Sequence, residues 1–372
     1  DHDMTYNFVE ERFDLPLSVV QDLHAREPIF GFSGLGEIVF RRSYSRRMDH
    51  GQESWADTVI RVINGLFSIA KDELVRKQHR SWDHAWWTQL ATKMAVTMFD
   101  MHWLPPGRGL WLMGTPYLYE RGAAGLMNCG YVDVCGRYSG TPSRLSHDAD
   151  WIMDMLMCGC GIGFSCGRTG LAFEQPHQQQ TNAAFVIPDS REGWTASVRQ
   201  LIESYEQGSA WVDFDYSEIR PAGSPIRGFG GTSSGPGPLR ILHERIRSFC
   251  GNYLMQQNGR YRDYTETRLV ADIVNAIGAC VVAGNVRRSA EIAIGSVHDN
   301  IFTNLKNYNR FPERAAWMGL SNNSVRLSYD EDFLALPQIA QGIRTNGEPG
   351  FMNMINIRQY GRFGDVVGTE VI

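Results

Sequence analysis

The sequence predicts an α/β fold in which the strands pair in parallel. Short apolar runs at 127–134, 290–294 and 349–353 have the length and residue types of strands. The segments between them carry apolar residues every three or four positions, which is the spacing of a helix packed along one face. Because parallel strands need a long connection, usually a helix, this strand–helix–strand order favours a parallel sheet.

Four predicted helices occupy 53–70, 84–102, 147–157 and 265–282. Ser54 and Asp57, three positions apart, form the pattern of a capping box at the start of the first helix. Residues 104–109 include two prolines and two glycines, which end the second helix. We place a boundary there, between a mostly helical region at 1–104 and an α/β region at 105–372.

Composition excludes several classes of protein. Hydrophobic residues make up 43% of the 372 positions and charged residues 21%, as in a globular chain with a large core. No apolar run approaches the roughly 18–20 residues of a membrane span, and the N-terminus shows no signal segment, so we expect a cytoplasmic protein. The net charge of −5 argues against a broad nucleic-acid surface. The pairs Arg41–Arg42 and Arg46–Arg47 are interpreted as solvated surface charge.

The seven cysteines include no C-x-x-C pair and are expected to be reduced. Cys158, Cys160 and Cys166 are close in sequence, but their spacings fit neither a structural zinc site nor an iron–sulfur site, so we expect no metal. Cys129 precedes an alternating apolar run and should lie on a strand. A thiol held there suits redox chemistry, although a strand cysteine is more often inert core.

Two glycine-rich segments are candidates for ligand contact. Residues 158–163 alternate cysteine or isoleucine with glycine, but they follow a predicted helix and lack a Gly-Lys-Ser/Thr sequence. They therefore fit neither a dinucleotide fingerprint nor a Walker A loop, and a packing turn and a substrate cradle both remain open. Residues 219–239 contain six glycines and four prolines, which predicts a long irregular loop of the kind that often carries function.

Three polar clusters stand at the ends of predicted core elements, at 284–291, 321–324 and 346–350. Their amides, hydroxyls and guanidiniums suit hydrogen bonding to a polyoxygenated anion such as a nucleotide. Ordinary capping and turn formation would use the same residue types. Three clusters at successive element ends favour a shared site over three unrelated turns.

Motifs in a consistent order make the sequence similar to the catalytic subunit of ribonucleotide reductases. It most resembles the adenosylcobalamin-dependent class II enzymes, particularly the monomeric kind that reduces triphosphates. The motifs run almost the length of the chain. They are Pro-Gly-Arg-Gly-Leu-Trp-Leu-Met-Gly-Thr at 106–115, Asn128-Cys129, Pro-Asp-Ser-Arg-Glu-Gly-Trp at 188–194, and the segments 219–236, 281–291, 317–325 and 346–350.

The resemblance implies a ten-stranded α/β barrel of the ribonucleotide reductase and glycyl-radical type, with 105–372 forming its first five-stranded half. It also implies radical chemistry that makes DNA precursors. Adenosylcobalamin generates a thiyl radical on a finger-loop cysteine, which removes the 3′ hydrogen of a ribonucleotide. Two further cysteines then reduce the 2′ carbon. The implied partners are a ribonucleotide substrate, a deoxynucleoside triphosphate effector and a thioredoxin-type or dithiol reductant, with no nucleic acid and no membrane.

The resemblance also implies roles for particular residues. Cys129 matches one member of the reducing pair. Thr115 and Asn128 fall where the family contacts substrate, and Gly161 and Gly163 match a glycine-rich turn beside it. The loop that relays effector identity to the substrate base corresponds to Arg220, Pro221, Gly223, Arg227, Gly228, Gly230 and Gly231.

The sequence departs from the family pattern at its end. After Gly368-Thr369 the family continues with Asn-Pro-Cys-Gly-Glu, which holds the radical cysteine and an acid/base glutamate, whereas this sequence reads Glu370-Val371-Ile372. We therefore expect those groups, and the redox partner of Cys129, to come from a second chain or from further residues. The alternatives are an effector-binding fragment without catalysis and a class I large subunit. The sequence Gly-Asn-Val-Arg-Arg-Ser at 284–289 favours class II over class I.

Overall fold

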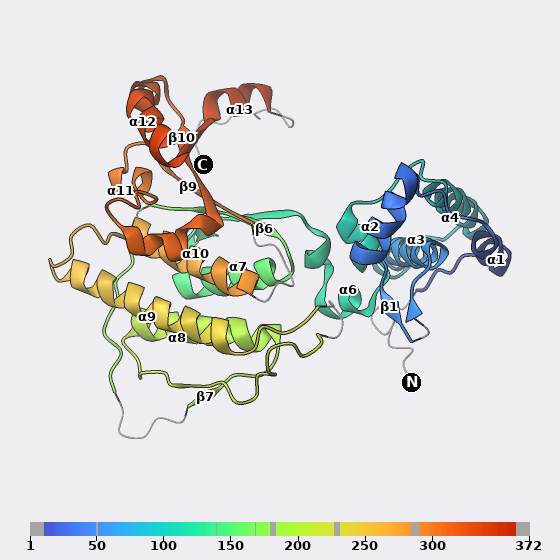
Figure 1. The fold of residues 1–372 in the computed structure, drawn as a ribbon, viewed down its shortest axis with the longest axis horizontal. Helices are drawn as coiled ribbons and strands as arrows, with labels where there is room; N and C mark the ends of the chain where they lie inside the picture. Colours follow the sequence, from blue (N-terminus) through green and yellow to red (C-terminus); the bar gives the residue numbers. More distant parts are fainter. Residues whose placement is uncertain are drawn as a thin grey trace. The chain divides into compact units, whose positions relative to one another are not determined.

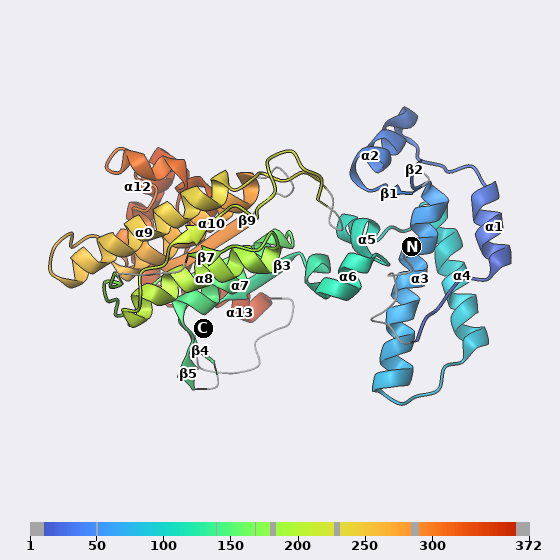
Figure 2. The same ribbon diagram turned by 90° about the horizontal axis from the view of Figure 1, so that it is seen from below.

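The computed structural model describes residues 11–49, 51–138, 140–167, 169–178, 184–226, 231–283 and 290–361. These residues form two compact units, which meet in the sequence at 127/128. Figures 1 and 2 draw the chain as a ribbon in two views. The compositional boundary at 104/105 falls between two helices of the first unit.

The first unit is built mainly from helices around one apolar core. It also contains a two-stranded antiparallel pair. The core is rich in aromatic side chains, with the Trp55, Phe40 and Phe67 rings buried among aliphatic residues. Its elements are α1 (Leu17–Ala25), α2 (Leu35–Ser43), β1 (Arg47–Met48), β2 (Gly51–Gln52), α3 (Trp55–Asp72), α4 (His84–Phe99), α5 (Gly107–Leu112) and α6 (Pro116–Arg121).

The predicted capping box at the start of α3 is confirmed. The Ser54 hydroxyl accepts a hydrogen bond from the Asp57 backbone N–H at 3.1 Å. The Asp57 carboxylate accepts one in return from the Ser54 N–H at 2.9 Å. Two backbone donors that no helical carbonyl can reach are thus satisfied, which fixes where the helix begins.

The second unit contains the predicted parallel sheet. Its strands are β3 (Cys129–Val132), β6 (Gly161–Ser165), β9 (Ala290–Ser296), β10 (Ser321–Leu327) and β11 (Gly350–Asn353), in the spatial order β11-β10-β9-β6-β3. Every neighbouring pair is parallel. The α/β prediction is therefore confirmed, and the open five-stranded sheet is consistent with part of a barrel.

Helices cover one face of this sheet in two layers. The inner layer is α7 (Leu145–Met157) and α10 (Glu266–Ala283), and the outer layer is α8 (Arg191–Gln207) and α9 (Gly237–Gln257) (Figure 1). The other elements are shorter. They are β4 (Arg137–Tyr138), β5 (Thr141–Pro142), β7 (Phe185–Val186), β8 (Phe214–Asp215), α11 (Asn300–Thr303), α12 (Leu336–Asn346) and α13 (Met354–Tyr360).

Burial alternates along the strands and separates the two faces of the sheet. In β9, Glu291 and Ala293 are buried, whereas Ala290 is exposed and Ile292 is half-buried. Because successive side chains of a strand point to opposite faces, one face packs on α7 and α10 and the other is open. Among the described helices, none is long and apolar enough to cross a membrane.

Strand β10 was not predicted. Its first residues, Ser321 to Ser324, were interpreted only as a polar cluster, because they lack the apolar alternation of a strand. Ser321 and Asn323 nevertheless point into the covered side and are almost fully buried. The Asn275 side chain of α10 accepts a hydrogen bond from the Ser321 N–H and donates one to its hydroxyl, at 2.9 and 3.0 Å. A partner distant in sequence therefore makes burial of this polar strand possible.

Candidate functional site

Cys129 begins the edge strand of the sheet, next to a glycine of the neighbouring strand. In the β3–β6 register, Cys129 lies opposite Gly161, and Tyr131 lies opposite Gly163. The Gly161 N–H donates a hydrogen bond to the Asn128 carbonyl at 2.7 Å. Three residues predicted from the resemblance, Cys129, Gly161 and Gly163, thus lie on two adjacent strands, and Asn128 directly precedes the first of them. Cys129 is exposed on the open side of the sheet.

The two glycines of β6 have different surroundings. A Cβ at Gly163 would lie 3.0 Å from Cδ2 of Tyr131 and 3.3 Å from Cγ2 of Ile292, so a side chain there would crowd both neighbours. A Cβ at Gly161 would meet nothing nearer than 3.5 Å, which is ordinary contact. Packing therefore explains glycine at 163. At 161 packing does not require glycine, and the missing side chain leaves room beside Cys129.

Cys129 differs from the other cysteines in its exposure. Cys158, Cys160, Cys166, Cys250 and Cys280 are buried, and Cys135 is half-buried. Burial is the main cause that raises the pKa of Cys135 to about 12, with the nearby Asp148 adding to it. Burial likewise raises the pKa of Cys280 to about 12. The inert-core interpretation therefore fits the buried thiols but is wrong for Cys129, which lies on a strand and is accessible.

Two of the three polar clusters are joined inside the protein. The Glu348 carboxylate accepts hydrogen bonds from the Asn323 N–H at 2.6 Å and from the Lys306 ammonium at 2.7 Å. Lys306 also donates to the Ser321 carbonyl at 2.5 Å. These groups tie the start of β10 to the turn before β11. Asn322 and Ser324, between them, lie on the open face. Residues 284–289 of the third cluster lie outside the described residues.

The segment predicted as a specificity loop folds back on itself. The Gly223 N–H donates to the Ser233 carbonyl at 2.8 Å, and the Ile226 N–H donates to the Gly231 carbonyl at 2.9 Å. Gly223 and Gly231 have φ angles of +87° and +92°, which disfavour any residue with a side chain. Pro221 lies in the same segment, two residues before Gly223. Arg227, Gly228 and Gly230 lie outside the described residues.

An ion pair connects this loop to the segment before α8. The Arg220 guanidinium donates through Nε to the Asp189 carboxylate at 2.6 Å and through Nη1 to the Pro225 carbonyl at 3.0 Å. Arg220 therefore connects the start of the loop both to Pro225 within the loop and to Asp189 of the motif at 188–194. The resemblance had placed both segments in the family pattern, but it did not predict that they pair.

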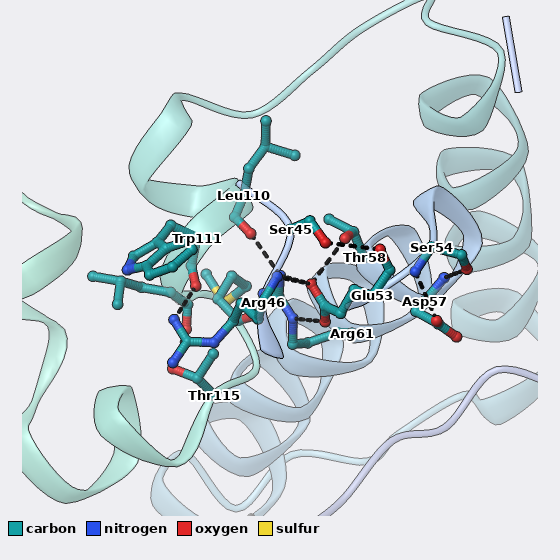
Figure 3. A network of polar contacts seen from close by, with 12 residues as sticks. Ser45, Arg46, Glu53, Ser54, Asp57, Thr58, Arg61, Leu110, Trp111 and Thr115 are labelled. Atoms are coloured by element: carbon teal, nitrogen blue, oxygen red, sulfur yellow. Dashed lines mark hydrogen bonds and ion pairs between the residues drawn. The ribbon is translucent and has the colours of Figure 1, made fainter. Parts of the chain in front are cut away.

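Thr115 belongs to the first unit, where a polar network holds the segment that precedes it (Figure 3). Arg61 donates from Nη2 to the Leu110 carbonyl at 2.7 Å and from Nη1 to the Met113 carbonyl at 2.6 Å. The Thr115 hydroxyl is buried and donates to the Leu112 carbonyl at 2.7 Å. These bonds fix the turn from α5 into α6, and with it the position of Thr115.

Glu53 is the acceptor at the centre of this network. Its carboxylate is almost fully buried and accepts from Arg61 Nε at 2.7 Å and from the Thr58 hydroxyl at 2.9 Å (Figure 3). Gly114 adds a steric constraint, since a Cβ there would lie 2.2 Å from the Arg61 carbonyl oxygen. Sequence analysis missed Glu53 and Arg61, because nothing in their spacing shows which distant carbonyls they meet.

The surface interpretation of Arg46 is wrong. Its guanidinium donates to the Trp111 carbonyl at 2.8 Å and lies over the Trp111 ring, 4.6 Å from the ring centroid. Burial is the main cause that lowers the pKa of Arg46 to about 10, and the positive charge of Arg61 contributes to this shift. Arg41, Arg42 and Arg47 are exposed, as expected.

Comparison with known proteins finds matches to ribonucleotide reductases. The ribonucleotide reductase alpha domain matches residues 15–115, and the insertion domain of B12-dependent ribonucleotide reductase matches residues 167–248. An adenosylcobalamin-dependent ribonucleoside-triphosphate reductase of Euglena gracilis is 40% identical over 95% of this chain and 47% of its own length. The corresponding enzyme of Lactobacillus leichmannii is 31% identical over 90% of this chain and 52% of its own length.

A solved structure agrees with these matches. The crystal structure of a B12-dependent, class II ribonucleotide reductase superposes with a TM-score of 0.73 at 26% identity, and covers 94% of this chain and 53% of that one. The chain therefore spans about half the length of the curated relatives it matches. The two domain matches, the relatives and the shared fold together make this chain similar to the class II, B12-dependent ribonucleotide reductases.

Proposed function

We propose that this chain takes part in the adenosylcobalamin-dependent reduction of ribonucleoside triphosphates to 2′-deoxyribonucleotides. The single observation that most supports this is the exposed Cys129 thiol at the start of β3, opposite Gly161 on the open face of the sheet. The relatives that carry this activity are about twice as long as the matched region. The activity is therefore proposed for an enzyme in which these residues act together with the other half of such a protein.

In this proposal Cys129 is one of two reducing thiols. Replacing the C2′–OH bond by C2′–H takes two electrons and two protons, and it releases the oxygen as water. Two cysteine thiols supply both electrons and both protons when they become a disulfide. A disulfide partner must approach Cys129 closely, and the exposed position at the sheet edge leaves its sulfur accessible for this. The second thiol is proposed to lie outside the matched half.

Adenosylcobalamin would supply the carbon-centred radical that starts the reaction. Within the described residues, no group of three or more His, Cys, Asp or Glu side chains is placed to hold a metal. That finding concerns a metal ion held by side chains alone and does not bear on the cobalt of this cofactor, which the corrin ring carries. What the described residues offer is the exposed thiol and the space left by Gly161 on the open face.

The remaining roles concern binding and partners. Thr115 and Asn128 would contact the substrate, and Gly161 and Gly163 would let it approach the backbone of β6. The loop at 220–231, fixed at its base by Arg220 and Asp189, would transmit the identity of a deoxynucleoside triphosphate effector. A thioredoxin-type or dithiol reductant would restore Cys129. This chemistry needs free thiols, which places the enzyme in a reducing compartment such as the cytoplasm.

The test is deoxynucleotide formation from each ribonucleoside triphosphate, assayed with this chain plus the complementary half of the Euglena relative, with dithiol and adenosylcobalamin. Product that forms only when the complementary half, the dithiol and adenosylcobalamin are all present supports the proposal. Product with a metalloprotein partner in place of the cofactor would favour a class I large subunit. Effector binding without any product would favour a non-catalytic fragment. A matched Cys129→Ser chain controls for contaminating reductase.

A further inference from the structure

Arg268 is a buried cation without a matching anion in the second unit. It belongs to α10, and only 3% of its surface is exposed. Its Nε and Nη1 atoms have no hydrogen-bond partner, and it forms no ion pair with any carboxylate among the described residues. A charged group that is buried without a partner is costly, because it has lost its hydration and gained nothing in return.

The carboxylates around Arg268 are already engaged elsewhere. Asp272, one turn further along α10, accepts from Arg314 at 2.7 Å, from the Tyr264 hydroxyl at 2.7 Å and from Trp317 Nε1 at 3.0 Å. Asp263 pairs with Arg310 at 2.7 Å. Arg314 and Arg310 are therefore each paired with a carboxylate, whereas Arg268 is not.

Aromatic rings hold the Arg268 guanidinium in place. It lies 4.4 Å from the centroid of the Phe311 ring and 4.9 Å from that of Tyr264, with Tyr261 at 5.5 Å. Ring faces attract a cation and offset part of the lost hydration, but they provide no acceptor for its N–H groups. The guanidinium is thus fixed in position, while its buried Nε and Nη1 atoms have no acceptor.

The Arg268 side chain lines a small cavity. The cavity has a volume of about 20 Å³, which is enough for one oxygen-sized group. Arg310, Arg314, Asn300 and Asn304 also line it, and no carboxylate does. Arg310 and Arg314 are each paired with a carboxylate outside the lining, so Arg268 supplies the uncompensated positive charge. A cavity with that charge, two amides and no acid in its lining has the chemistry of an anion site.

A larger groove adjoins this cavity and shares Asn304 and Arg310 with it. Its volume is about 610 Å³, within the range of pockets that bind small molecules. It too is lined by no carboxylate. Amide and hydroxyl side chains from the α11 region and from α12 dominate the lining: Thr303, Asn304, Asn307, Asn309, Gln338, Gln341, Thr345 and Asn346. Such side chains can pair with the donors and acceptors of a sugar or a base.

We propose that this cavity and groove form a second nucleotide-binding site, separate from Cys129. A phosphate oxygen would occupy the cavity at Arg268, and the sugar and base would lie in the amide-lined groove. The proposal does not rest on the reductase chemistry, because it requires neither a thiol nor a cofactor. It rests on an unpaired buried guanidinium beside a groove that carries no negative charge.

The test is equilibrium binding of inorganic phosphate, ribose 5-phosphate and AMP to the full 372-residue chain, in phosphate-free buffer without adenosylcobalamin. We expect affinity to rise in that order. Arg268→Met keeps the packing volume but removes the charge, and should weaken AMP binding by about 10- to 100-fold, the range of one charge-assisted contact. Arg262→Gln removes an exposed arginine nearby and should leave binding unchanged.

A second variant keeps the test decisive if Arg268→Met does not fold. Asn307→Asp retains the side-chain oxygen that accepts from the Arg310 N–H and adds a negative charge to the groove, so it should also weaken AMP binding. Loss of AMP binding in Arg268→Met and in Asn307→Asp would assign the bound AMP to this site, because both residues lie away from Cys129 and the proposed reductase site. The proposal is overturned if phosphate binds as tightly as AMP, or if Asn307→Asp and Arg268→Met bind AMP unchanged.

Discussion

Arg61 and Glu53 form a buried ion pair in the first unit, with 2.7 Å between Arg61 Nε and Glu53 Oε2. The Arg61 side chain is only 11% exposed and that of Glu53 only 1%. The same guanidinium donates to two backbone carbonyls of the segment that leads to Thr115. The ion pair therefore links the start of α3 to a residue proposed to contact the substrate, so Arg61 acts as a positioning residue.

Removing Arg61 should destabilise the first unit strongly. Arg61→Met leaves the buried Glu53 carboxylate without its cation, which typically costs about 3–5 kcal/mol. Hydrogen exchange should then accelerate in residues 107–115, whose carbonyls lose their donors. Arg41→Met, which breaks an exposed pair with Glu37, is the matched control and should change stability by less than about 0.5 kcal/mol. Equal effects of the two variants on urea unfolding would contradict the positioning role.

The two glycines of β6 should respond differently to the same substitution. Gly163→Ala places a methyl against Tyr131 and Ile292, so one of these side chains must shift, and the substitution should cost more stability than Gly161→Ala. Gly161→Ala finds only ordinary contacts, so the fold should tolerate it, but the methyl would occupy space beside Cys129. We expect normal thermal unfolding with a raised KM in the completed enzyme. A Gly161→Ala enzyme with unchanged KM would show that this space is not used by substrate.

Native alkylation should distinguish Cys129 from the other thiols. With iodoacetamide at pH 8, Cys129 should react first because it is exposed. Cys158, Cys160, Cys166, Cys250 and Cys280 should react only after unfolding, since they are buried, and the raised pKa of Cys135 should slow that thiol as well. Peptide mass spectrometry at successive times provides the order. If a buried cysteine reacts as fast as Cys129, the assigned accessibility is wrong.

The second unit should lose stability in mild acid because of His243. This imidazole accepts from or donates to the Ser197 and Tyr216 hydroxyls at 2.8 and 2.7 Å, and burial lowers its pKa to about 3, with Arg247 contributing. Below the unfolded value of about 6.5 the unfolded chain binds a proton that the folded chain does not. Stability should therefore fall between pH 6.5 and pH 3, by at most about 1.4 kcal/mol per pH unit from this group.

The control for that pH dependence is the His243→Gln variant. Glutamine can still hydrogen-bond both hydroxyls but does not titrate, so its unfolding free energy should decline less steeply from pH 6.5 towards pH 4. His298, which is 68% exposed in its side chain, provides a comparison, since His298→Gln leaves the buried imidazole in place. Parallel curves for the unaltered chain and His243→Gln would show that another group causes the acid sensitivity.

The sequence predicted best where the determinants are local. Ser54 and Asp57 identified the start of α3 because a capping box uses residues three apart. The alternation after Cys129 identified β3, because alternation is likewise a property of residues that are close in sequence. Neither pattern showed that Cys129 would be exposed, because exposure depends on β3 being the edge strand, and strand order is set by the whole chain.

The sequence predicted least where one residue meets a distant one. Ser321 and Asn323 carry no strand pattern, and they are buried only because Asn275 and Glu348 satisfy their polar groups. Arg46 and Arg47 are adjacent, yet one binds the Trp111 carbonyl and the other is exposed. Local spacing contains no information about such partners. The unpaired Arg268 is a further example, since its isolation emerges only once the other carboxylates are assigned.

The most direct measurement is a single turnover without external reductant. The chain, the complementary half of a relative, adenosylcobalamin and a ribonucleoside triphosphate are mixed and quenched, and the cysteine peptides are analysed. The proposal predicts about one deoxynucleotide per enzyme, with Cys129 recovered in a disulfide in equal amount, and no product from Cys129→Ser. Full product formation with Cys129 still a free thiol, or undiminished product from Cys129→Ser, would contradict it.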